Sequence, residues 1–140
     1  LHDLGVEVSH IDSHHHVHSI PRVFPVLKRV QKRYQIRRVR ISRNMYGANE
    51  GTPWRLRLKK SAYNFLLRRY YRTATTGGFT DFKTFYESGK TSKPKHRVIE
   101  LMVHPGSRAF DYEDETEILS GPWRDDLSFP VRLVNYHGVG

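Results

Sequence analysis

The first third of the chain changes from one hydrophobic period to another and back, and this order restricts the folds open to it. Residues 6–12 alternate between apolar and polar side chains, which predicts a strand, and residues 37–42 alternate again. Between them, residues 21–34 repeat apolar side chains at helical spacing after Ser19, a suitable N-cap. Such a strand, loop, helix, strand unit forms parallel sheets with a right-handed crossover. The sequence therefore predicts an α/β fold in which these two strands are parallel.

The rest of the chain predicts further elements, and its length of 140 residues suits a single domain spanning 1–140. The expected elements are a loop over 43–53, a basic amphipathic helix over 54–72, a breaker over 73–78, a short helix over 80–86, a buried strand over 98–103, a loop and helix start up to 117, and a final strand over 131–136. The sequence contains no internal repeat and no low-complexity segment.

Five of the nine histidines lie within residues 10–18, at the end of the first predicted strand. The period of two puts His10 and Asp12 on one side of that strand, and an extended continuation adds His14. Imidazole and carboxylate groups that converge at a strand end are suitable ligands for a divalent metal ion. Two other interpretations stay open from the residues alone: an interrupted expression tag, and a solvated histidine-rich loop without metal.

A second candidate for function is His104, which follows the predicted buried strand over 98–103 and precedes Pro105 and Gly106. Ligands bind at the carboxyl ends of parallel strands, because the loops that follow the strands converge there. The alternative interpretation is a turn histidine that Pro105 holds in place.

Charge is unevenly distributed along the chain, which has a formal net charge of +10. Residues 20–72 contain sixteen Lys and Arg against one acid, Glu50, whereas residues 111–126 contain seven acids and only Arg124 as a base. Such asymmetry is typical of proteins with anionic partners such as nucleic acid, phosphorylated lipid or a membrane surface. The alternative is that the basic residues form the solvent-exposed face of a helix and pair in part with the acidic residues.

Two absences in the sequence also bear on chemistry and location. The chain has no cysteine, so it forms no disulfide and offers a metal ion only nitrogen and oxygen ligands. It has no run of about 18 or more apolar residues and no secretory leader. We therefore expect a soluble, cytoplasmic protein without a transmembrane segment.

Two sequence blocks resemble a known family. The run His-Ile-Asp-Ser-His-His-His-Val-His at 10–18, followed by Pro21, Phe24-Pro25 and the basic strand at Arg40, resembles the signature of the YdjC-like carbohydrate deacetylases. This family includes chitooligosaccharide deacetylase and members associated with hopanoid biosynthesis. The run Glu-Leu-Met-Val-His-Pro-Gly at 100–106 resembles the family's second block, in which a strand ends in His-Pro. The similarity covers most of residues 6–136.

The resemblance implies a variant of the (β/α) barrel, a divalent metal ion (Mg²⁺ or Zn²⁺) and an N-acetylated oligosaccharide or glycolipid as substrate. Carried over to this sequence, His14 corresponds to a metal ligand, and His104 falls where a histidine lines the active site and suits a general acid. Asp12 joins His104 as a catalytic candidate, and its carboxylate suits orientation of the ligand. Arg40 is expected to contact the substrate or a neighbouring carboxylate. The other histidines of the motif are expected to support the site: His10, His16 and His18.

The implied mechanism is metal-assisted hydrolysis of an N-acetyl group. A bound metal ion would lower the pKa of its water molecule towards neutrality and polarise the amide carbonyl, and a carboxylate base would complete activation of the water. The ion would supply positive charge for the tetrahedral oxyanion, and a histidine would protonate the departing amine.

The chain departs from the family pattern at its N-terminal side. The family begins with a strand ending in an Asn-Ala-Asp-Asp-Phe-Gly type block and continues with a Gly-x-His segment, and the chain contains neither. It therefore resembles the C-terminal half or so of the family, which implies an incomplete barrel without its N-terminal strands. Three explanations stay open: a truncated product or fragment, a separate polypeptide that supplies the other strands, or a metal ion held differently, through Asp12 and His16. We expect a homo-oligomer or a partner chain to cover the open barrel edges.

Two competing functions accompany the deacetylase hypothesis. One is a basic module that binds nucleic acid or an anionic surface without catalysis, through aromatic side chains interleaved with Arg and Lys. Those aromatic residues are Trp54, Tyr63, Tyr70 and Tyr71. No RNA-binding or helix-turn-helix signature accompanies them, so we do not expect nucleic acid as the partner. The other is a catalytically inactive structural fragment, because the sequence shows no complete set of metal ligands.

Overall fold

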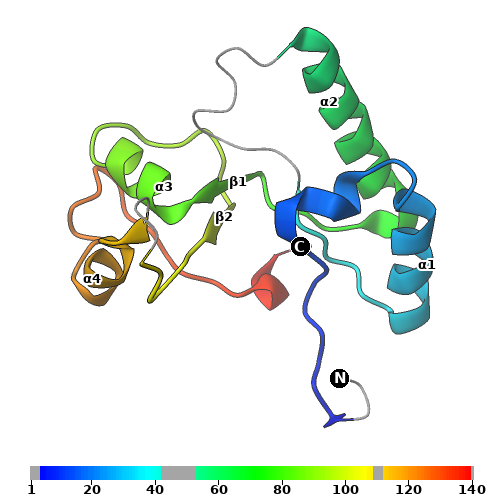
Figure 1. Ribbon diagram of the computed structural model, residues 1–140, viewed down its shortest axis with the longest axis horizontal. Helices are drawn as coiled ribbons and strands as arrows, with labels where there is room; N and C mark the ends of the chain where they lie inside the picture. The colour runs from blue at the N-terminus through cyan, green and yellow to red at the C-terminus, as the bar shows by residue number, and fades with distance from the viewer. Residues whose placement is uncertain (1–3, 42–52, 109–111, 140) are drawn as a thin grey trace.

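The computed structural model describes residues 4–41, 53–108 and 112–139 (Figure 1). Its main feature is parallel pairing between segments that are distant in the sequence. Strand β1 (Gly78–Asp81) pairs in parallel with strand β2 (Ile99–Met102) in a two-stranded sheet. The predicted strand over 98–103 is confirmed by β2, although its side chains are only half-buried. The predicted breaker over 73–78 is wrong at its end, because Gly78 begins β1.

Two single bridges extend the parallel arrangement beyond this sheet. One joins Ile11 to Val39, and the other joins Arg38 to Ala74. The Ile11 N–H donates to the Arg38 carbonyl at 2.9 Å, and the Arg40 N–H donates to the Ile11 carbonyl at 3.0 Å. The predicted parallel orientation is therefore confirmed. The predicted regular strands over 6–12 and 37–42 are wrong within the described residues, because only these bridges form there.

The connection between the first two bridges holds two helical segments. A kinked 3₁₀ segment, η2 (His14–Ser19), follows the Ile11 bridge, and α1 (Phe24–Tyr34) follows η2. Helix α1 carries Pro in its first turn and ends at Tyr34. The next residue, Gln35, has a left-handed φ of 56° and its N–H donates to the Gln31 carbonyl, which caps the helix. The predicted helix over 21–34 is confirmed except for its first three residues, which form a turn.

Helix α2 (Trp54–Arg69) confirms most of the basic helix predicted over 54–72. It ends earlier than predicted because Tyr71 has a φ of 61°, and the chain continues as a 3₁₀ turn, η3 (Tyr70–Arg72). The Nζ of Lys28 in α1 donates to the carbonyls of Leu67 and Tyr70 at 2.9 and 3.0 Å, and thereby caps the end of α2. The predicted loop over 43–53 lies outside the described residues apart from Pro53.

Helix α3 (Phe82–Gly89) begins two residues later than the helix predicted over 80–86 and extends through Gly89. Its N-cap is Asp81, whose carboxylate accepts a hydrogen bond from the Thr84 N–H at 2.8 Å. Because the preceding residues pair with β2, Thr80 belongs to the strand rather than to the helix.

The C-terminal segment contains short helical elements instead of the final strand predicted over 131–136. Helix α4 (Glu115–Ser120) follows the acidic loop, and a 3₁₀ turn, η5 (Tyr136–Gly138), lies near the end. Residues 130–135 have no regular structure and form no described ladder with a neighbour, so the strand prediction is wrong. An alternating pattern indicates a strand only where a partner edge is available.

The molecule contains two hydrophobic cores, one in each of two halves. We call residues 4–41 and 53–74 the N-terminal half, and residues 75–108 and 112–139 the C-terminal half. Figure 1 shows α1 and α2 on one side and α3, α4 and the β1–β2 sheet on the other. The first core packs four buried side chains: Leu27, Val39, Tyr63 and Leu67. The second core packs five: Phe82, Phe85, Tyr86, Trp123 and Leu127.

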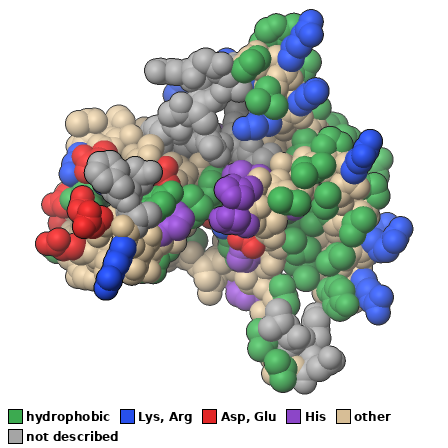
Figure 2. Space-filling view, in the orientation of Figure 1, with side chains coloured by type: hydrophobic (Ala, Val, Ile, Leu, Met, Phe, Trp, Pro, Cys, Tyr) green, Lys and Arg blue, Asp and Glu red, His purple; other side chains and the backbone are tan. Residues whose placement is uncertain are grey.

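The surface keeps the charge asymmetry of the sequence. Figure 2 shows histidine side chains gathered between the two halves, acidic side chains over the region of α4, and basic side chains around the helices of the N-terminal half. The histidines therefore lie at the junction of a basic and an acidic region. Of the helices that the structure describes, none combines the length and the apolar character needed to span a membrane.

Candidate functional site at the junction of the halves

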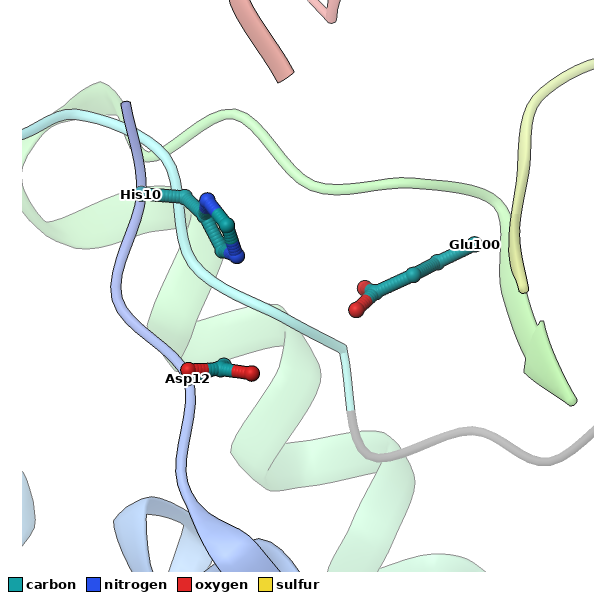
Figure 3. Close-up of side chains that lie close together, drawn as sticks. All are labelled: His10, Asp12 and Glu100. Atoms are coloured by element: carbon teal, nitrogen blue, oxygen red, sulfur yellow. The ribbon is translucent and has the colours of Figure 1, made fainter. Parts of the chain in front are cut away.

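Three side chains that could bind a metal ion meet at the junction of the two halves. His10 and Asp12 flank the Ile11 bridge and therefore point to the same side, whereas Glu100 extends from β2 (Figure 3). One potential ligand atom from each of the three lies within 4.8 Å of the other two. A nitrogen and two carboxylate oxygens form a donor set that suits a divalent cation.

Arg40 already brings a positive charge to these carboxylates. Its Nη2 donates to Asp12 Oδ2 at 2.8 Å, and its Nε donates to Glu100 Oε1 at 2.5 Å. The side chain of Glu100 is only 8% exposed and that of Arg40 only 16%, so the Arg40–Glu100 pair is largely withdrawn from water. A buried carboxylate needs such a partner, because an uncompensated charge there costs several kcal/mol. The guanidinium therefore joins the two halves electrostatically.

Tyr136 completes this group of side chains, which we call the Arg40 centre: His10, Asp12, Arg40, Glu100 and Tyr136. The Tyr136 hydroxyl donates to Glu100 Oε2, and its ring stacks on the His10 ring with centroids 3.7 Å apart. Burial, followed by this hydrogen bond to a carboxylate, raises the pKa of Tyr136, so the phenol stays protonated. Burial also lowers the pKa of His10, against the opposing effect of Asp12 and Glu100.

Phe79 in β1 forms the apolar wall of the Arg40 centre. Its side chain is 4% exposed, and the Arg40 guanidinium lies over its ring at 4.8 Å from the centroid. The edge of the same ring meets His16 at a centroid distance of 5.0 Å. A cation over an aromatic face is favourable and more so when water is excluded. One ring of the C-terminal half thus contacts two polar residues of the N-terminal half.

His18 stabilises the backbone of Arg40 through hydrogen bonds on both of its ring nitrogens. Its Nε2 bonds the Arg40 carbonyl at 3.0 Å, and because a carbonyl only accepts, Nε2 carries the proton. Its Nδ1 lies 2.7 Å from Ser13 Oγ and accepts from that hydroxyl in the neutral ring. The Tyr63 hydroxyl donates to the His18 carbonyl at 2.5 Å. Burial lowers the pKa of His18, which agrees with a neutral ring that fixes the backbone of Arg40.

His16 and His14 differ in their surroundings. The Nδ1 of His16 is buried and has no hydrogen-bond partner among the described residues, and burial lowers the pKa of His16. His14 is exposed at the start of η2, where its ring meets the His15 ring edge to face with centroids 4.0 Å apart. The grouping of potential ligand atoms contains His10, Asp12 and Glu100 and does not contain His14. The ligand role of His14 stays a prediction.

His104 lies at a second polar position, just beyond the C-terminal end of β2. Its ring stacks on Tyr112 with centroids 3.9 Å apart, and its backbone N–H donates to Glu115 Oε2 at 2.8 Å. Its Nδ1 is 3.5 Å from the same carboxylate oxygen. Glu115 is fully buried. The structure thus pairs His104 with α4, whereas it brings Asp12, Arg40 and His10 together at the Arg40 centre.

Four residues of these sites were not identified as site residues from the sequence. Glu100 was visible only as an acid that interrupts an apolar strand, and that interruption is the signal that could have identified it. Tyr136 and Phe79 carry no comparable signal, since their roles arise from contacts with distant segments. Glu115 belongs to an acidic stretch in which no single carboxylate stands out.

A cavity of about 1540 Å³ lies against the Arg40 centre. Its lining includes His10, Glu100 and Tyr136 from that centre, together with Trp123 and Phe82 from the core of the C-terminal half. His10, Glu100 and Tyr136 therefore border a space large enough for a ligand.

Comparison with known proteins agrees with the two sequence blocks. A carbohydrate deacetylase of Vibrio campbellii (strain ATCC BAA-1116) is 31% identical over 112 residues, which are 73% of this chain and 34% of that protein. A carbohydrate deacetylase of Geobacillus stearothermophilus is 54% identical over 41 residues, which are 28% of this chain and 17% of that protein. The chain spans about a third of the length of the Vibrio campbellii protein. No solved structure matches the chain.

The family match covers nearly all of the chain. The sequence model described as YdjC-like protein matches residues 1–129, which include the histidine cluster, the Arg40 centre up to Glu100, and His104 with Glu115. The expected relationship is thereby confirmed, and the chain belongs to the YdjC-like protein family.

Proposed function

We propose that this chain is part of a metal-dependent hydrolase that removes N-acetyl groups from amino-sugar-containing carbohydrates. The observation that carries the proposal is the convergence of Asp12, Arg40 and Glu100 beside parallel segments in a chain of the YdjC-like family. The relatives named as carbohydrate deacetylases support a carbohydrate substrate. An N-acetylated oligosaccharide or glycolipid is the substrate class that we propose.

The proposal includes a (β/α)-barrel-like fold around these parallel segments. The bridges at Ile11 and Ala74 and the β1–β2 pair all have the parallel orientation that a barrel requires. In such folds the reacting groups gather at the carboxyl ends of the strands, and His104 follows β2 in this way. The parallel orientation and the position of His104 support the barrel.

A divalent metal ion, Mg²⁺ or Zn²⁺, is the proposed cofactor. The donor set His10, Asp12 and Glu100 fits such an ion chemically, although an ion there would compete with the Arg40 guanidinium for both carboxylates. We propose His14 as a residue that holds the ion, because it is exposed and follows Asp12 closely in the sequence. When bound, the ion supplies polarisation of the amide carbonyl and acidification of a water molecule.

The residues of this chain then have separate tasks in amide hydrolysis. A water oxygen adds to the amide carbon, and the Asp12 carboxylate takes a proton from that water. The carbon–nitrogen bond breaks while the His104 imidazolium gives a proton to the departing amine, which releases acetate and the free amino sugar. Arg40 orients Asp12 through their 2.8 Å contact and contacts the substrate. Tyr136 and His18 keep the Arg40 centre in place through Glu100 and the Arg40 backbone.

The direct test is acetate release from an N-acetylated oligosaccharide with added Zn²⁺ or Mg²⁺. We expect acetate release that chelation abolishes, and loss of bound metal in His14→Ala. His15→Ala is the matched control, because His15 is adjacent and also exposed, and this variant should keep its metal. Should His10→Ala lose metal while His14→Ala keeps it, the ligand set is the His10, Asp12 and Glu100 grouping instead. Absence of both acetate release and metal binding in the folded protein contradicts the proposal.

We further propose that a second copy or a partner chain covers part of this chain. Helix α2 supports this, since Trp54, Leu58 and Phe65 are 68%, 62% and 67% exposed. Exposed apolar side chains that gather on one element commonly mark an association surface. Light scattering should show an oligomer, and a monodisperse monomer with a cooperative melt contradicts this part of the proposal.

A second candidate function rests on the same helix. The Arg55 guanidinium lies over the Trp54 ring at 5.5 Å, and further basic side chains surround the exposed apolar ones. Basic and aromatic side chains together suit an anionic surface or single-stranded nucleic acid. Binding to anionic vesicles or to single-stranded nucleic acid that weakens steeply with salt, without acetate release, favours this function.

A further inference from the structure

The carboxylate of Glu115 is buried, and no Lys or Arg among the described residues forms an ion pair with it. Glu115 is 0% exposed at the start of α4, and its Oε2 accepts a hydrogen bond from the His104 N–H at 2.8 Å. Its Oε1 is buried and has no hydrogen-bond partner among the described residues. Burial of an ionised group is costly unless donors surround it. The position therefore calls for a further proton donor beside the carboxylate.

The imidazole of His104 is the group that can supply that donor. Its Nδ1 is buried, lies 3.5 Å from Glu115 Oε2, and lacks a hydrogen-bond partner among the described residues. Stacking on Tyr112 holds the plane of the ring at 28° to the tyrosine ring. A proton on Nδ1 gives this nitrogen an acceptor in Glu115 Oε2, whereas a proton on Nε2 alone leaves two acceptors facing each other.

The surrounding backbone holds the carboxylate and the imidazole together. The Ser107 N–H donates to the His104 carbonyl at 3.0 Å, which closes a turn in which Gly106 has a φ of 77°. The Gly106 N–H donates to Thr116 Oγ1 at 2.7 Å. Two consecutive side chains of α4 thus bind two backbone N–H groups of this turn, and only Glu115 also reaches the imidazole.

We propose that Glu115 is a positioning residue that keeps a proton on Nδ1 of His104 and leaves Nε2 as the reacting nitrogen. The inference rests on the proposed function, in which His104 protonates the departing amine. The imidazolium gives its Nε2 proton to the amine, and the neutral ring that remains carries its proton on Nδ1, where the carboxylate accepts it. Glu115 therefore stabilises the charged ring before the transfer and the correct tautomer after it.

The test is the tautomer of His104, read from the ring ¹⁵N resonances of the labelled protein near neutral pH. The signals are assigned by their loss in His104→Gln. We expect Nδ1–H in the wild type and a shift to Nε2–H in Glu115→Gln. Thr116→Val is the matched control, because it removes the other tie between α4 and the turn but keeps the carboxylate, and it should retain Nδ1–H. A wild-type ring protonated on Nε2, or an unchanged tautomer in Glu115→Gln, overturns the proposal.

Two further readouts make the test decisive. If Glu115→Gln does not fold, a slowly exchanging Nδ1–H proton in the wild type supports the proposal, and its absence overturns it. In an active protein, Glu115→Gln should lower kcat about 10- to 100-fold with KM nearly unchanged, because a partner that orients a reacting group contributes about that much. An inactive wild type contradicts the proposed function while the tautomer result still decides the role of Glu115.

Discussion

The two halves of the molecule bury different kinds of side chain at their centres. The N-terminal half surrounds a buried lysine, Lys28, with oxygen acceptors, whereas the C-terminal half packs aromatic rings such as Phe82 and Trp123 against one another. Hydrogen bonds to a cation depend on direction and protonation, whereas ring packing depends on volume. The N-terminal half should therefore respond to charge and pH, and the C-terminal half to loss of volume.

The largest expected effect is that of Phe82→Ala in the aromatic core. Phe82 is 1% exposed and meets Trp123 edge to face at a centroid distance of 5.1 Å. Removal of a fully buried ring should lower the free energy of unfolding by about 3–5 kcal/mol. Urea unfolding followed by Trp123 fluorescence in a Trp54→Phe background measures it. Phe65→Ala is the control, since Phe65 is 67% exposed, and it should stay within about 0.5 kcal/mol. Equal effects of the two variants would contradict the view that the C-terminal core depends on the volume of its buried rings.

Arg40→Met tests the electrostatic contact between the halves. Loss of the guanidinium leaves the Glu100 carboxylate, 8% exposed, without its cation, which should cost about 3 kcal/mol of unfolding free energy. Arg38→Met is the matched control, because Arg38 donates to the neutral carbonyls of Val139 and His137 among the described residues, and its loss should cost about 1 kcal/mol. Adding Glu100→Gln to Arg40→Met should restore part of the stability, and no restoration contradicts a charge effect.

Lys28→Met tests the polar centre of the N-terminal half. The variant keeps the aliphatic stem but removes the Nζ donor from the carbonyls of Leu67 and Tyr70, of which the Tyr70 carbonyl still accepts from the Thr73 hydroxyl. This change should cost about 2 kcal/mol in urea unfolding. Lys32→Met is the control on the exposed face of α1 and should change little. A cost no larger than that of the control shows that the ammonium contributes nothing to stability.

The titration of Lys28 gives a smaller, pH-dependent signal. Burial lowers the pKa of Lys28 from 10.5 to about 8, so between these values the unfolded lysine holds its proton more tightly than the folded one. The free energy of unfolding should therefore rise as pH increases from about 8 to 10.5, and Lys28→Met should lack this component of the rise. Parallel curves for the two proteins contradict it.

The smallest expected effect is a difference in stability between the two halves at acidic pH. Burial lowers the pKa of His16 and of His18 below 6.5, so the unfolded state binds more protons as pH falls through this range. The stability contributed by the neutral rings is present above pH 6.5 and is lost as pH falls below it. Hydrogen exchange, corrected for intrinsic rates, should show more loss of protection in α1 than in α3 between neutral and mildly acidic pH. Equal loss in both helices contradicts this difference.

Elements with a clear hydrophobic pattern in their own residues could be predicted from the sequence, whereas strands that depend on pairing with a distant segment were predicted wrongly. Helices α1 and α2 and strand β2 follow from periodicity over their own residues. Residues 131–136 alternate like a strand but pair with no edge in the part of the chain that the structure describes, whereas β1 forms from a stretch with weak strand character because β2 pairs with it. Parallel strands are stabilised by residues far along the chain, and a local window does not contain them.

The same distinction applies to the candidate site. The histidine cluster and His104 stand out in the sequence because of residue type and spacing. Glu100 and Tyr136 become site residues only because β2 and the C-terminal turn lie beside the Ile11 bridge in the folded chain. Arg40 and Glu100, for example, are 60 residues apart in the sequence. Glu115 becomes one because α4 folds back on the turn after β2. Residue types suited to catalysis or metal binding can therefore be recognised in the sequence, whereas the contacts between distant residues become apparent only in the folded structure.

Phe79 makes the geometry of the Arg40 centre a measure of how the two halves are oriented. The ring belongs to β1 but touches Arg40 with its face and His16 with its edge. A rotation of one half against the other would move this ring away from both contacts and would also separate Glu100 from Arg40. Opening between the halves and disassembly of the carboxylate group are consequently a single event, and a ligand wedged between the halves would act directly on the charges at the centre.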